Sequence, residues 1–262
     1  MREILYGRQP VRECLRARRR HIHRLFLSEG IGEKGVIAEI LDLATGLKVP
    51  LKRVPRAQLN RFAKLNQGVA LEAASYPYVE VADILRRAGK SAELPFILAL
   101  DHLQDPHNLG ALLRTAEVVG ADGAVIPHRR AAEVTPAVVS ASAGASEHLR
   151  VAQVTNLART LEAFKAEGLW VIGVENYPGA QLYNQVDLDM PLALVVGSED
   201  QGLSRLVRET CDFLLRLPMC GQIESLNASV AGGIVLYAVL TARGFSAGTF
   251  TDSRKGGIPT LS

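Results

Sequence analysis

Residues 217–237 read LPMCGQIESLNASVAGGIVLY, and the two halves of this stretch require opposite surroundings. Pro218 lacks a backbone N–H and Gly221 permits unusual dihedral angles, so the first half predicts an irregular loop whose carbonyl groups can face a ligand. In the second half, small and branched apolar residues occupy every face of a predicted helix over 226–242, which Ser225 would cap. Because about 15 residues cannot span a bilayer, this helix belongs in a core or in a subunit interface.

Buried segments of the same kind extend upstream of this stretch. Near-continuous apolar runs predict strands that are buried on both faces of a parallel sheet, at 96–100, 124–126, 170–174, 192–196 and 213–217. Helical patterns separate most of these runs, at 108–119, 136–143, 156–166 and 226–242. The alternation predicts an α/β domain over residues 95–243.

The first part of the chain predicts a second, smaller α/β domain over residues 1–75. Its pattern gives strands at 25–27, 49–54 and 69–73, and helices at 36–43 and 57–62 after an N-terminal helix. Residues 76–94 differ in composition from both neighbours, and we interpret them as the connection between the two domains. The small, polar and Gly-rich segment 244–262 predicts a disordered tail.

The net charge of +3 conceals a strong asymmetry between the two predicted domains. Residues 1–75 contain 15 Lys and Arg against 7 Asp and Glu, a balance of +8, whereas residues 76–262 contain 15 against 20, a balance of −5. Neutralisation of a phosphate backbone explains such a basic domain better than solubility does, although a solvated basic surface is the alternative. The charge lies on an arginine-rich first helix and in a cluster formed by Arg53, Arg56, Arg61 and Lys64.

Several classes of protein are excluded by the absence of their motifs. The three cysteines form no CxxC, which argues against a disulfide framework and a zinc site. There is no GxGxxG after a strand, no GxxxxGK[ST] and no GxSxG, so neither a dinucleotide fold, a P-loop nor a hydrolase is indicated. Asp101, His102, Asp105 and His107 lack a recognisable ligand spacing, so we predict no metal. Without an apolar leader or spanning segment, we expect a cytoplasmic protein.

Three polar segments interrupt the apolar second domain, and the first lies at 105–116. In it, Asn108 can cap the following helix, and Gly110 lets a ligand approach the first turn. Arg114 lies among apolar residues and therefore needs an anionic partner. A structural ion pair would satisfy Arg114 as well as a bound substrate would.

The second polar segment, 196–204, follows a buried strand, where open α/β sheets bind their ligands. Gly197 and Gly202 bracket Glu199 and fit a backbone that curves closely around a small molecule, although an ordinary turn would also contain them. The third segment is the loop of residues 217–227. Its Ser225 and Asn227 are either ligand contacts or only helix caps.

In order and spacing, these three segments resemble the three motifs of the SpoU (TrmH) family of RNA ribose 2′-O-methyltransferases. The matching residues are Asn108, Gly110, Arg114, Thr115 and Ala116; Gly197, Ser198, Glu199, Gly202, Leu203 and Ser204; and Leu217, Pro218, Met219, Gly221, Ser225, Leu226, Asn227, Ser229, Val230 and Ala231. Each motif is weak alone, but the set is specific. The chain departs from the family at Asp200, where glycine is usual, and at Ala228, where valine is usual.

Further similarity extends over the whole chain, at 4–7, 66–68, 105–110 and 155–159. These segments resemble the members of the family that methylate a guanosine in the peptidyl-transferase loop of 23S rRNA, although Asn66 stands where those members often have histidine. The resemblance implies a trefoil-knotted α/β (SPOUT) methyltransferase domain that binds S-adenosylmethionine, preceded by an RNA-binding domain similar to ribosomal protein L30e. It also implies a homodimer that packs through the C-terminal helix, with 23S rRNA as its partner and no metal. The implied cofactor contacts are Gly197, Ser198, Leu217, Met219, Ser225 and Leu226.

The implied reaction is an in-line transfer of a methyl group from a sulfonium to a ribose hydroxyl, and positioning and charge stabilisation can supply most of the catalysis. Arg114 is expected to stabilise the oxygen. The residues expected to orient Arg114, the ribose or the adjacent phosphate are Asn108, Glu199, Ser225 and Asn227. Whether Arg114 also takes the hydroxyl proton stays open, because a guanidinium is effectively always charged, and Glu199 is the alternative base. The alternatives are a methyltransferase for tRNA or another rRNA site, and a non-catalytic RNA-binding or ribosome-assembly protein.

Overall fold

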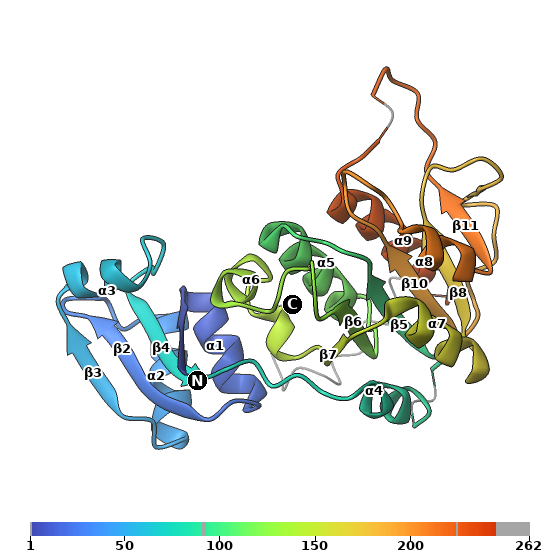
Figure 1. The fold of residues 1–262 in the computed structure, drawn as a ribbon. Coiled ribbons are helices and arrows are strands. Elements are labelled where there is room, and N and C mark those ends of the chain that lie inside the picture. The colour runs from blue at the N-terminus through green and yellow to red at the C-terminus, as the bar shows by residue number, and fades with distance from the viewer. Residues whose placement is uncertain (1, 91–92, 224, 245–262) are drawn as a thin grey trace, which may run out of the picture.

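The computed structural model describes residues 2–90, 93–223 and 225–244, and it contains two α/β units built around separate sheets (Figure 1). The predicted tail, except Gly244, lies outside these residues. Within the described parts of the chain, no helix combines the length and apolar character that crossing a membrane requires.

The N-terminal unit is built on a four-stranded sheet with the order β1-β4-β2-β3. Its strands are β1 (Arg2–Tyr6), β2 (Ile22–Ser28), β3 (Leu51–Val54) and β4 (Val69–Ala74). Strand β4 runs antiparallel to β1 and β2, whereas β2 and β3 are parallel. The helices are α1 (Arg8–Ala17), α2 (Val36–Gly46) and α3 (Arg56–Phe62). The sequence pattern predicted these elements except β1, an edge strand with a single fully buried residue and therefore little alternation.

The second unit contains a seven-stranded sheet with the order β7-β6-β5-β10-β8-β11-β9, in which every pair of neighbours is parallel. Its strands are β5 (Phe96–Leu100), β6 (Gly123–Pro127), β7 (Val151–Val154), β8 (Trp170–Val174), β9 (Gln181–Leu182), β10 (Leu192–Val196) and β11 (Phe213–Arg216). The predicted parallel α/β sheet is therefore confirmed. Strands β7 and β9 were missed because one contains a glutamine and the other has only two residues.

Both faces of this sheet are covered, as the apolar runs predicted. Leu98 pairs with Leu194 and both pack into one core cluster, while the adjacent Ile97 and Ala193 pack into another. One face is covered by helices α5 (Pro106–Val118), α6 (Pro136–Ala141) and α9 (Ala228–Ala242). The other is covered by α4 (Val81–Ala88), α7 (Leu157–Ala166) and α8 (Arg205–Thr210). The segment 76–94 thus contains a helix that packs on the sheet.

Two helix caps differ from the sequence prediction. Asp105, not Asn108, caps α5: its carboxylate accepts bonds from two backbone N–H groups of the first turn. Pro106 favours this start because its fixed φ suits the first helical position. Asn227, not Ser225, caps α9 in the same way. Asn108 and Ser225 are therefore free of the capping role.

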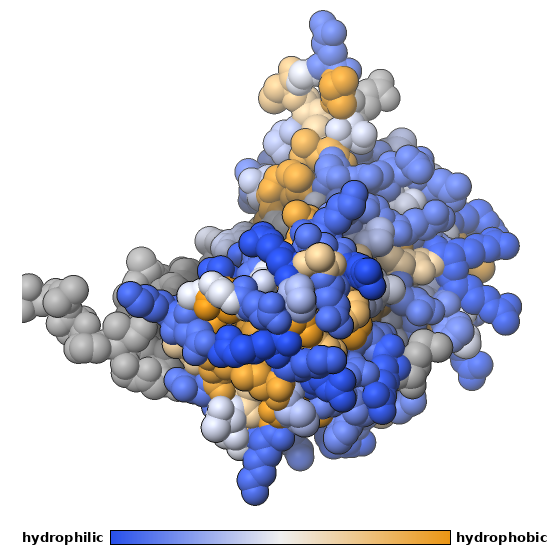
Figure 2. Space-filling view, turned by 90° about the vertical axis from the view of Figure 1, so that its left-hand side faces the viewer, coloured by the Kyte–Doolittle hydropathy of each residue, from blue (hydrophilic) through white to orange (hydrophobic). Residues whose placement is uncertain are grey.

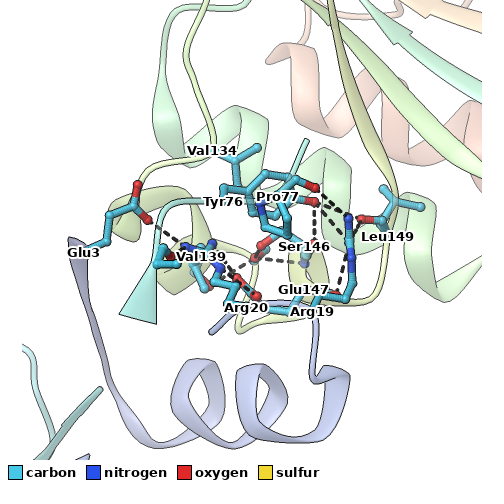
Figure 3. A network of polar contacts seen from close by, with 12 residues as sticks. Glu3, Arg19, Arg20, Tyr76, Pro77, Val134, Val139, Ser146, Glu147 and Leu149 are labelled. Carbon is cyan, nitrogen blue, oxygen red and sulfur yellow. Dashed lines mark hydrogen bonds and ion pairs between the residues drawn. The ribbon is translucent and has the colours of Figure 1, made fainter. Parts of the chain in front are cut away.

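A polar network joins the end of α1 to the second unit (Figure 3). The buried guanidinium of Arg20 donates to both carboxylate oxygens of Glu147, at 2.7 and 3.0 Å, and to Glu3 at 2.7 Å. Arg19 donates to three backbone carbonyls, the closest being that of Leu149 at 2.7 Å. Burial raises the pKa of Tyr76 to about 12, and its neutral hydroxyl lies 2.8 Å from the Ser146 carbonyl oxygen, to which it donates.

The arginine-rich face predicted for the first helix is largely neutralised within the protein. Arg12 and Arg16 pair with Glu13 and Glu39, and Arg20 is buried between carboxylates of both units. The expectation that this helix presents its arginines to a polyanion is therefore wrong for these three residues. Their charges are neutralised by glutamates of the same chain, in ion pairs that hold this part of the protein in place.

The two units also share apolar packing. Leu5 and Leu15 belong to the same core cluster as Val139 of α6. Gly144 has a φ of 88°, and a Cβ there would lie 2.7 Å from the Cβ of Glu13, so only glycine permits this approach of α1. The N-terminal unit therefore cannot be removed without exposing core residues of the second.

Candidate cofactor cavity and catalytic cluster

A cavity of about 430 Å³ lies beyond the carboxyl ends of the adjacent strands β8, β10 and β11. This is the edge at which parallel sheets bind ligands, and the volume suits a small molecule. All six residues predicted to contact a cofactor line it: Gly197, Ser198, Leu217, Met219, Ser225 and Leu226. The structure thus brings together residues from two of the three polar segments. The loop between β11 and α9, which supplies four of them, projects from the top of the molecule in Figure 1.

The two glycines around Glu199 are required because the loop closes on itself. Ser198 and Gly202 form an antiparallel bridge in which each backbone N–H donates to the carbonyl oxygen of the other, at 3.2 and 3.0 Å. A Cβ on Gly197 would lie 2.3 Å from the carbonyl carbon of Gly202. Gly202 itself has a φ of 62°, which favours glycine. The result is a tight turn that holds Glu199 at its tip.

Glu199 joins all three polar segments. Its Oε1 accepts a bond from Asn108 Nδ2 at 2.9 Å, from the backbone N–H of Ala228 at 3.3 Å, and from the side-chain amide of Asn227. Asn227 also donates to Asn108 Oδ1 at 3.0 Å. The cluster of Asn108, Glu199 and Asn227 therefore connects the start of α5, the turn after β10 and the start of α9.

Two further carboxylates fix this turn, and the sequence analysis missed both roles. Glu175, just after β8, makes a bidentate ion pair with Arg208 at 2.6 and 2.9 Å and accepts the Leu203 N–H at 3.2 Å. The fully buried Asp101, just after β5, accepts the Ser204 N–H at 2.6 Å. Both residues follow parallel strands that neighbour β10, so their position at the same sheet edge could have been used to find them.

Arg114 is exposed on α5, six residues after Asn108, a rise of about 9 Å. Among the described residues, none forms an ion pair or hydrogen bond with its guanidinium. The structural ion pair that would have explained Arg114 is thus not found. Arg114 does not line the cavity either, so the structure leaves its charge available at the surface of α5.

The cavity is acidic. Glu175, Glu199 and Asp200 line it, and of these only Glu175 is paired with a cation in the described parts of the chain. The donors to Glu199 are neutral amides, so none of them offsets the charge of a carboxylate. A ligand with a positive group is therefore favoured here. No group of three or more potential metal ligands occurs among the residues that the structure describes.

A second hollow, of about 810 Å³, runs along α9 and is lined mainly by apolar side chains. Val230, Ile234 and Tyr237 are exposed at 49%, 37% and 50% along one side of this helix, while Leu236 and Val239 are buried. The helix predicted to be apolar on every face thus buries one side in its own chain and leaves the other uncovered.

Comparison with known proteins identifies the two units. Residues 95–237 match the model of the SpoU rRNA Methylase family, and residues 4–79 match a model described as RNA 2′-O ribose methyltransferase substrate binding. A Bacillus subtilis protein assigned to the TrmH family of tRNA/rRNA methyltransferases, YacO, is 45% identical over 92% of this chain and 96% of its own. A Staphylococcus aureus protein of the same description is 43% identical over 92% and 96%.

Solved structures agree in fold. AviRb from Streptomyces viridochromogenes, a SpoU methyltransferase solved with AdoMet, has a TM-score of 0.76 at 20% identity, over 92% of this chain and 90% of that chain. A structure described as an RNA 2′-O ribose methyltransferase has a TM-score of 0.76 at 25% identity, over 92% and 89%. The TrmH/SpoU tRNA modifying enzyme of A. aeolicus matches 62% of this chain and 81% of its own, with a TM-score of 0.53 at 29% identity. The chain therefore belongs to the SpoU (TrmH) family of RNA methyltransferases.

Proposed function

We propose that this protein transfers the methyl group of S-adenosylmethionine to the ribose 2′-hydroxyl of a guanosine in the peptidyl-transferase loop of 23S rRNA. The observation that carries the proposal is the cluster of Asn108, Glu199 and Asn227, which adjoins an acidic cavity lined by the residues expected to contact the cofactor. A protein that only binds RNA has no use for such a combination.

The residues of the cavity fit S-adenosylmethionine. Its sulfonium and amino groups are cationic and suit the carboxylates of Glu199 and Asp200. The apolar side chains of Leu217, Met219 and Leu226 can pack against the adenine, and the backbone groups beside them can bind its polar edge. When bound, the cofactor supplies an activated methyl group.

The residues of the cluster hold the reacting groups in position. Arg114 provides an unpaired positive charge that stabilises the developing alkoxide of the ribose, while the proton of the hydroxyl passes to solvent water. Asn108 and Asn227 orient Glu199, and with Ser225 they can donate to the ribose or the adjacent phosphate. We assign Glu199 a tethering role because three donors already occupy its Oε1.

A homodimer that packs through α9 accords with the uncovered apolar side of this helix. Burial of exposed Val230, Ile234 and Tyr237 against a second copy would remove apolar surface from water. We further propose the trefoil knot of the family for residues 95–243, an L30e-like RNA-binding domain for residues 1–75, and a cytoplasmic location.

An rRNA substrate is favoured over tRNA by the N-terminal unit. The tRNA modifying enzyme of A. aeolicus matches only 62% of this chain, whereas the chain also has a segment of the substrate-binding type at 4–79. The resemblance of residues 4–7 and 66–68 to the 23S rRNA guanosine enzymes supports the finer assignment.

Methylation with labelled S-adenosylmethionine tests the proposal. Unmodified 23S rRNA and bulk tRNA are incubated separately with the protein, and the labelled nucleotide is mapped. We expect label in 23S rRNA at one guanosine of the peptidyl-transferase loop. Label in tRNA alone would contradict the proposed substrate but not the proposed reaction. If the protein neither transferred the methyl group nor bound S-adenosylmethionine, the alternative of a non-catalytic RNA-binding protein would be favoured.

A further inference from the structure

A separate cavity of about 500 Å³ lies in the N-terminal unit, between the β1–α1 turn, the end of β2 and the turn before β4. Its lining residues are Arg8, Ser28, Glu29, Gly30, Ile31, Arg56, Gln67 and Gly68. The volume is in the range of small-ligand sites and is sufficient for one nucleotide. None of these residues belongs to the cofactor cavity or to the cluster around Glu199.

The two arginines of this cavity, Arg8 and Arg56, differ from Arg12, Arg16 and Arg20 in their pairing. Arg12, Arg16 and Arg20 are paired with glutamates, as described above. Arg8 and Arg56 are exposed, and no ion pair joins either guanidinium to a carboxylate in the described parts of the chain. Arg8 instead donates its Nε to the backbone carbonyl oxygen of Gln67 at 3.3 Å. The positive charge is therefore available to a ligand and held at the rim of the cavity.

The turn that forms the cavity floor has a fixed shape. Gln67 has a φ of 52°, unusual for a residue with a side chain, and its Oε1 accepts the Arg8 backbone N–H at 2.9 Å. Gly68 has a φ of 83°, and a Cβ there would lie 2.5 Å from Ile31 Cδ1. The fully buried Asn66 braces the turn by accepting the Gly68 N–H at 2.8 Å. A strained and braced turn beside unpaired charge is typical of a binding site.

Exposed apolar side chains lie in the same segment of the chain. Phe62 and Leu65, which come just before the turn, are exposed at 38% and 78%. Phe62 packs against Phe26 at a ring-centroid distance of 5.3 Å, with the two rings tilted by 54°, so its ring is held in place while one part stays open to solvent. Figure 2, which views this side of the molecule, shows apolar patches set in a mostly hydrophilic face. Aromatic surface beside arginines suits an unstacked base.

We propose that this cavity binds one unpaired nucleotide of a single-stranded RNA segment, outside the nucleotide that is methylated. Arg8 and Arg56 neutralise the flanking phosphates, and Phe62 offers a stacking surface to an adjacent base. The inference deepens the proposed function, because it names the residues through which the N-terminal unit holds the RNA substrate. In Figure 1, α3 and the turn after it lie on the same upper side of the molecule as the loop between β11 and α9, so one RNA can approach both.

Glu29 gives the cavity a preference for a nucleotide over a simple anion. Its carboxylate would repel a phosphate placed beside it, but it can accept from the N–H groups of a base. The side-chain amide nitrogen of Gln67 donates to no other described residue and can bond a base acceptor. The phosphates thus belong beside the two arginines, and the base beside Glu29 and Gln67.

The test measures binding of the full-length protein to an unstructured single-stranded RNA and to an RNA duplex, by fluorescence anisotropy over a series of salt concentrations. The double variant Arg8→Ala/Arg56→Ala should weaken single-strand binding and lower the slope of log affinity against log salt by about 1.4, since each lost phosphate contact on a single strand accounts for about 0.7. Phe62→Leu should weaken binding by about 5-fold or more without changing the slope. Glu29→Ala should also weaken binding with an unchanged slope.

Arg2→Ala is the matched control, because Arg2 lies at the opposite end of β1, about 17 Å from the cavity along the strand, and pairs with Glu72. It should change neither affinity nor slope, and the single variant Arg56→Lys, which keeps the charge, should keep the wild-type slope. Thermal unfolding of each variant checks that the fold is retained. The inference is overturned if the double variant keeps the wild-type slope, or if Arg2→Ala loses as much affinity as the double variant does. It is also overturned if Glu29→Ala binds more tightly, or if the protein prefers the duplex.

The outcome is separable from that of the proposed function. If the wild-type protein binds RNA through Arg8 and Arg56 but transfers no methyl group, the catalytic proposal fails and this inference stands. If the double variant methylates RNA with unchanged RNA affinity, this inference fails and the catalytic proposal stands.

Discussion

Glu199 Oε1 lies 2.9 Å from Asn108 Nδ2, although 91 residues separate the two in the chain. The bond ties the turn after β10 to the first turn of α5, and Asn227 adds the start of α9 to the same contact. Three loops that would otherwise be independent are thereby held in one arrangement at the mouth of the cofactor cavity. Positioning of this kind is a large part of what a methyl transfer between two bound reactants requires.

Substitution of Glu199 separates tethering from proton transfer. In Glu199→Gln, the amide oxygen can still accept the bonds of Asn108 and Asn227, so we expect methyl transfer within about tenfold of the wild type. Glu199→Ala should lose about a hundredfold or more, because the neighbouring amides lose their acceptor. Steady-state kinetics of both variants provide the check. An equal loss of about 10²- to 10⁴-fold in both variants would instead identify Glu199 as a general base.

Arg114→Ala should lower the rate of methyl transfer by about 10²- to 10³-fold, the range for loss of one group that stabilises a developing charge. Cofactor affinity and thermal stability should stay unchanged, because Arg114 has no partner among the described residues. Arg86→Ala is a matched control, since Arg86 is an exposed helical arginine whose ion pair with Asp83 contributes little. Unfolding of the Arg114 variant would instead mean that its charge is structural.

Gly197→Ala should damage the cofactor cavity. The new Cβ would lie 2.3 Å from the carbonyl carbon of Gly202, so the turn must open, at a cost of about 1–3 kcal/mol. We expect calorimetric titration to show at least tenfold weaker binding of S-adenosylmethionine. Gly46→Ala, where a Cβ meets nothing within 4 Å, should leave cofactor binding at the wild-type level. Similar affinities in both variants would contradict the assigned role of the turn.

The contact between the two units should depend on pH through Glu13 and His148, whose side chains lie 2.9 Å apart. The hydrogen bond that His148 donates to the Glu13 carboxylate raises the pKa of His148 above 6.5, so its stabilisation is complete below pH 6.5 and is lost as pH rises through the raised pKa. Burial alone would raise the pKa of Glu13, but bonds from His148 and Arg12 hold it at about 2. Its stabilisation is complete above pH 4.5 and is lost as pH falls towards 2.

The pair therefore contributes most between about pH 4.5 and 6.5. His148→Gln should lower the melting temperature more at pH 5.5 than at pH 8.5, as measured by calorimetry. His128→Gln is the control, because His128 is exposed and no side-chain bond joins it to the described residues. A difference between wild type and His148→Gln that is the same at both pH values would rule out this linkage.

The sequence predicted the parallel sheet because strands buried on both faces, such as 96–100 and 192–196, read as unbroken apolar runs. The six predicted cofactor contacts came from the family resemblance, and in the structure all six residues line one cavity. The sequence could not show which arginines form ion pairs within the protein, because composition does not distinguish an arginine that faces RNA from one that faces a buried carboxylate. Arg20 meets Glu147 across 127 residues, a contact that exists only in the folded chain.

Glu175 was missed for a similar reason: one carboxylate after a strand has no pattern of its own, and its meaning comes from Arg208 and the turn that it supports. The shared core also changes how the N-terminal unit should be studied. Deletion of residues 1–75 would leave the fully buried Glu147 without Arg20, and loss of one partner of a buried pair costs about 3–5 kcal/mol. Point variants such as those at Arg8 and Arg56 are therefore the better probes of RNA binding.

The most direct measurement is nucleoside analysis of 23S rRNA after reaction with S-adenosylmethionine and the purified protein. The RNA is digested to nucleosides, and mass spectrometry of the methylated product distinguishes a methyl group on the ribose from one on the base. We expect 2′-O-methylguanosine with the wild-type protein, and formation of the same product about 10²- to 10³-fold more slowly with Arg114→Ala. A methyl group on a base, or ribose methylation at the wild-type rate in Arg114→Ala, would contradict the mechanism.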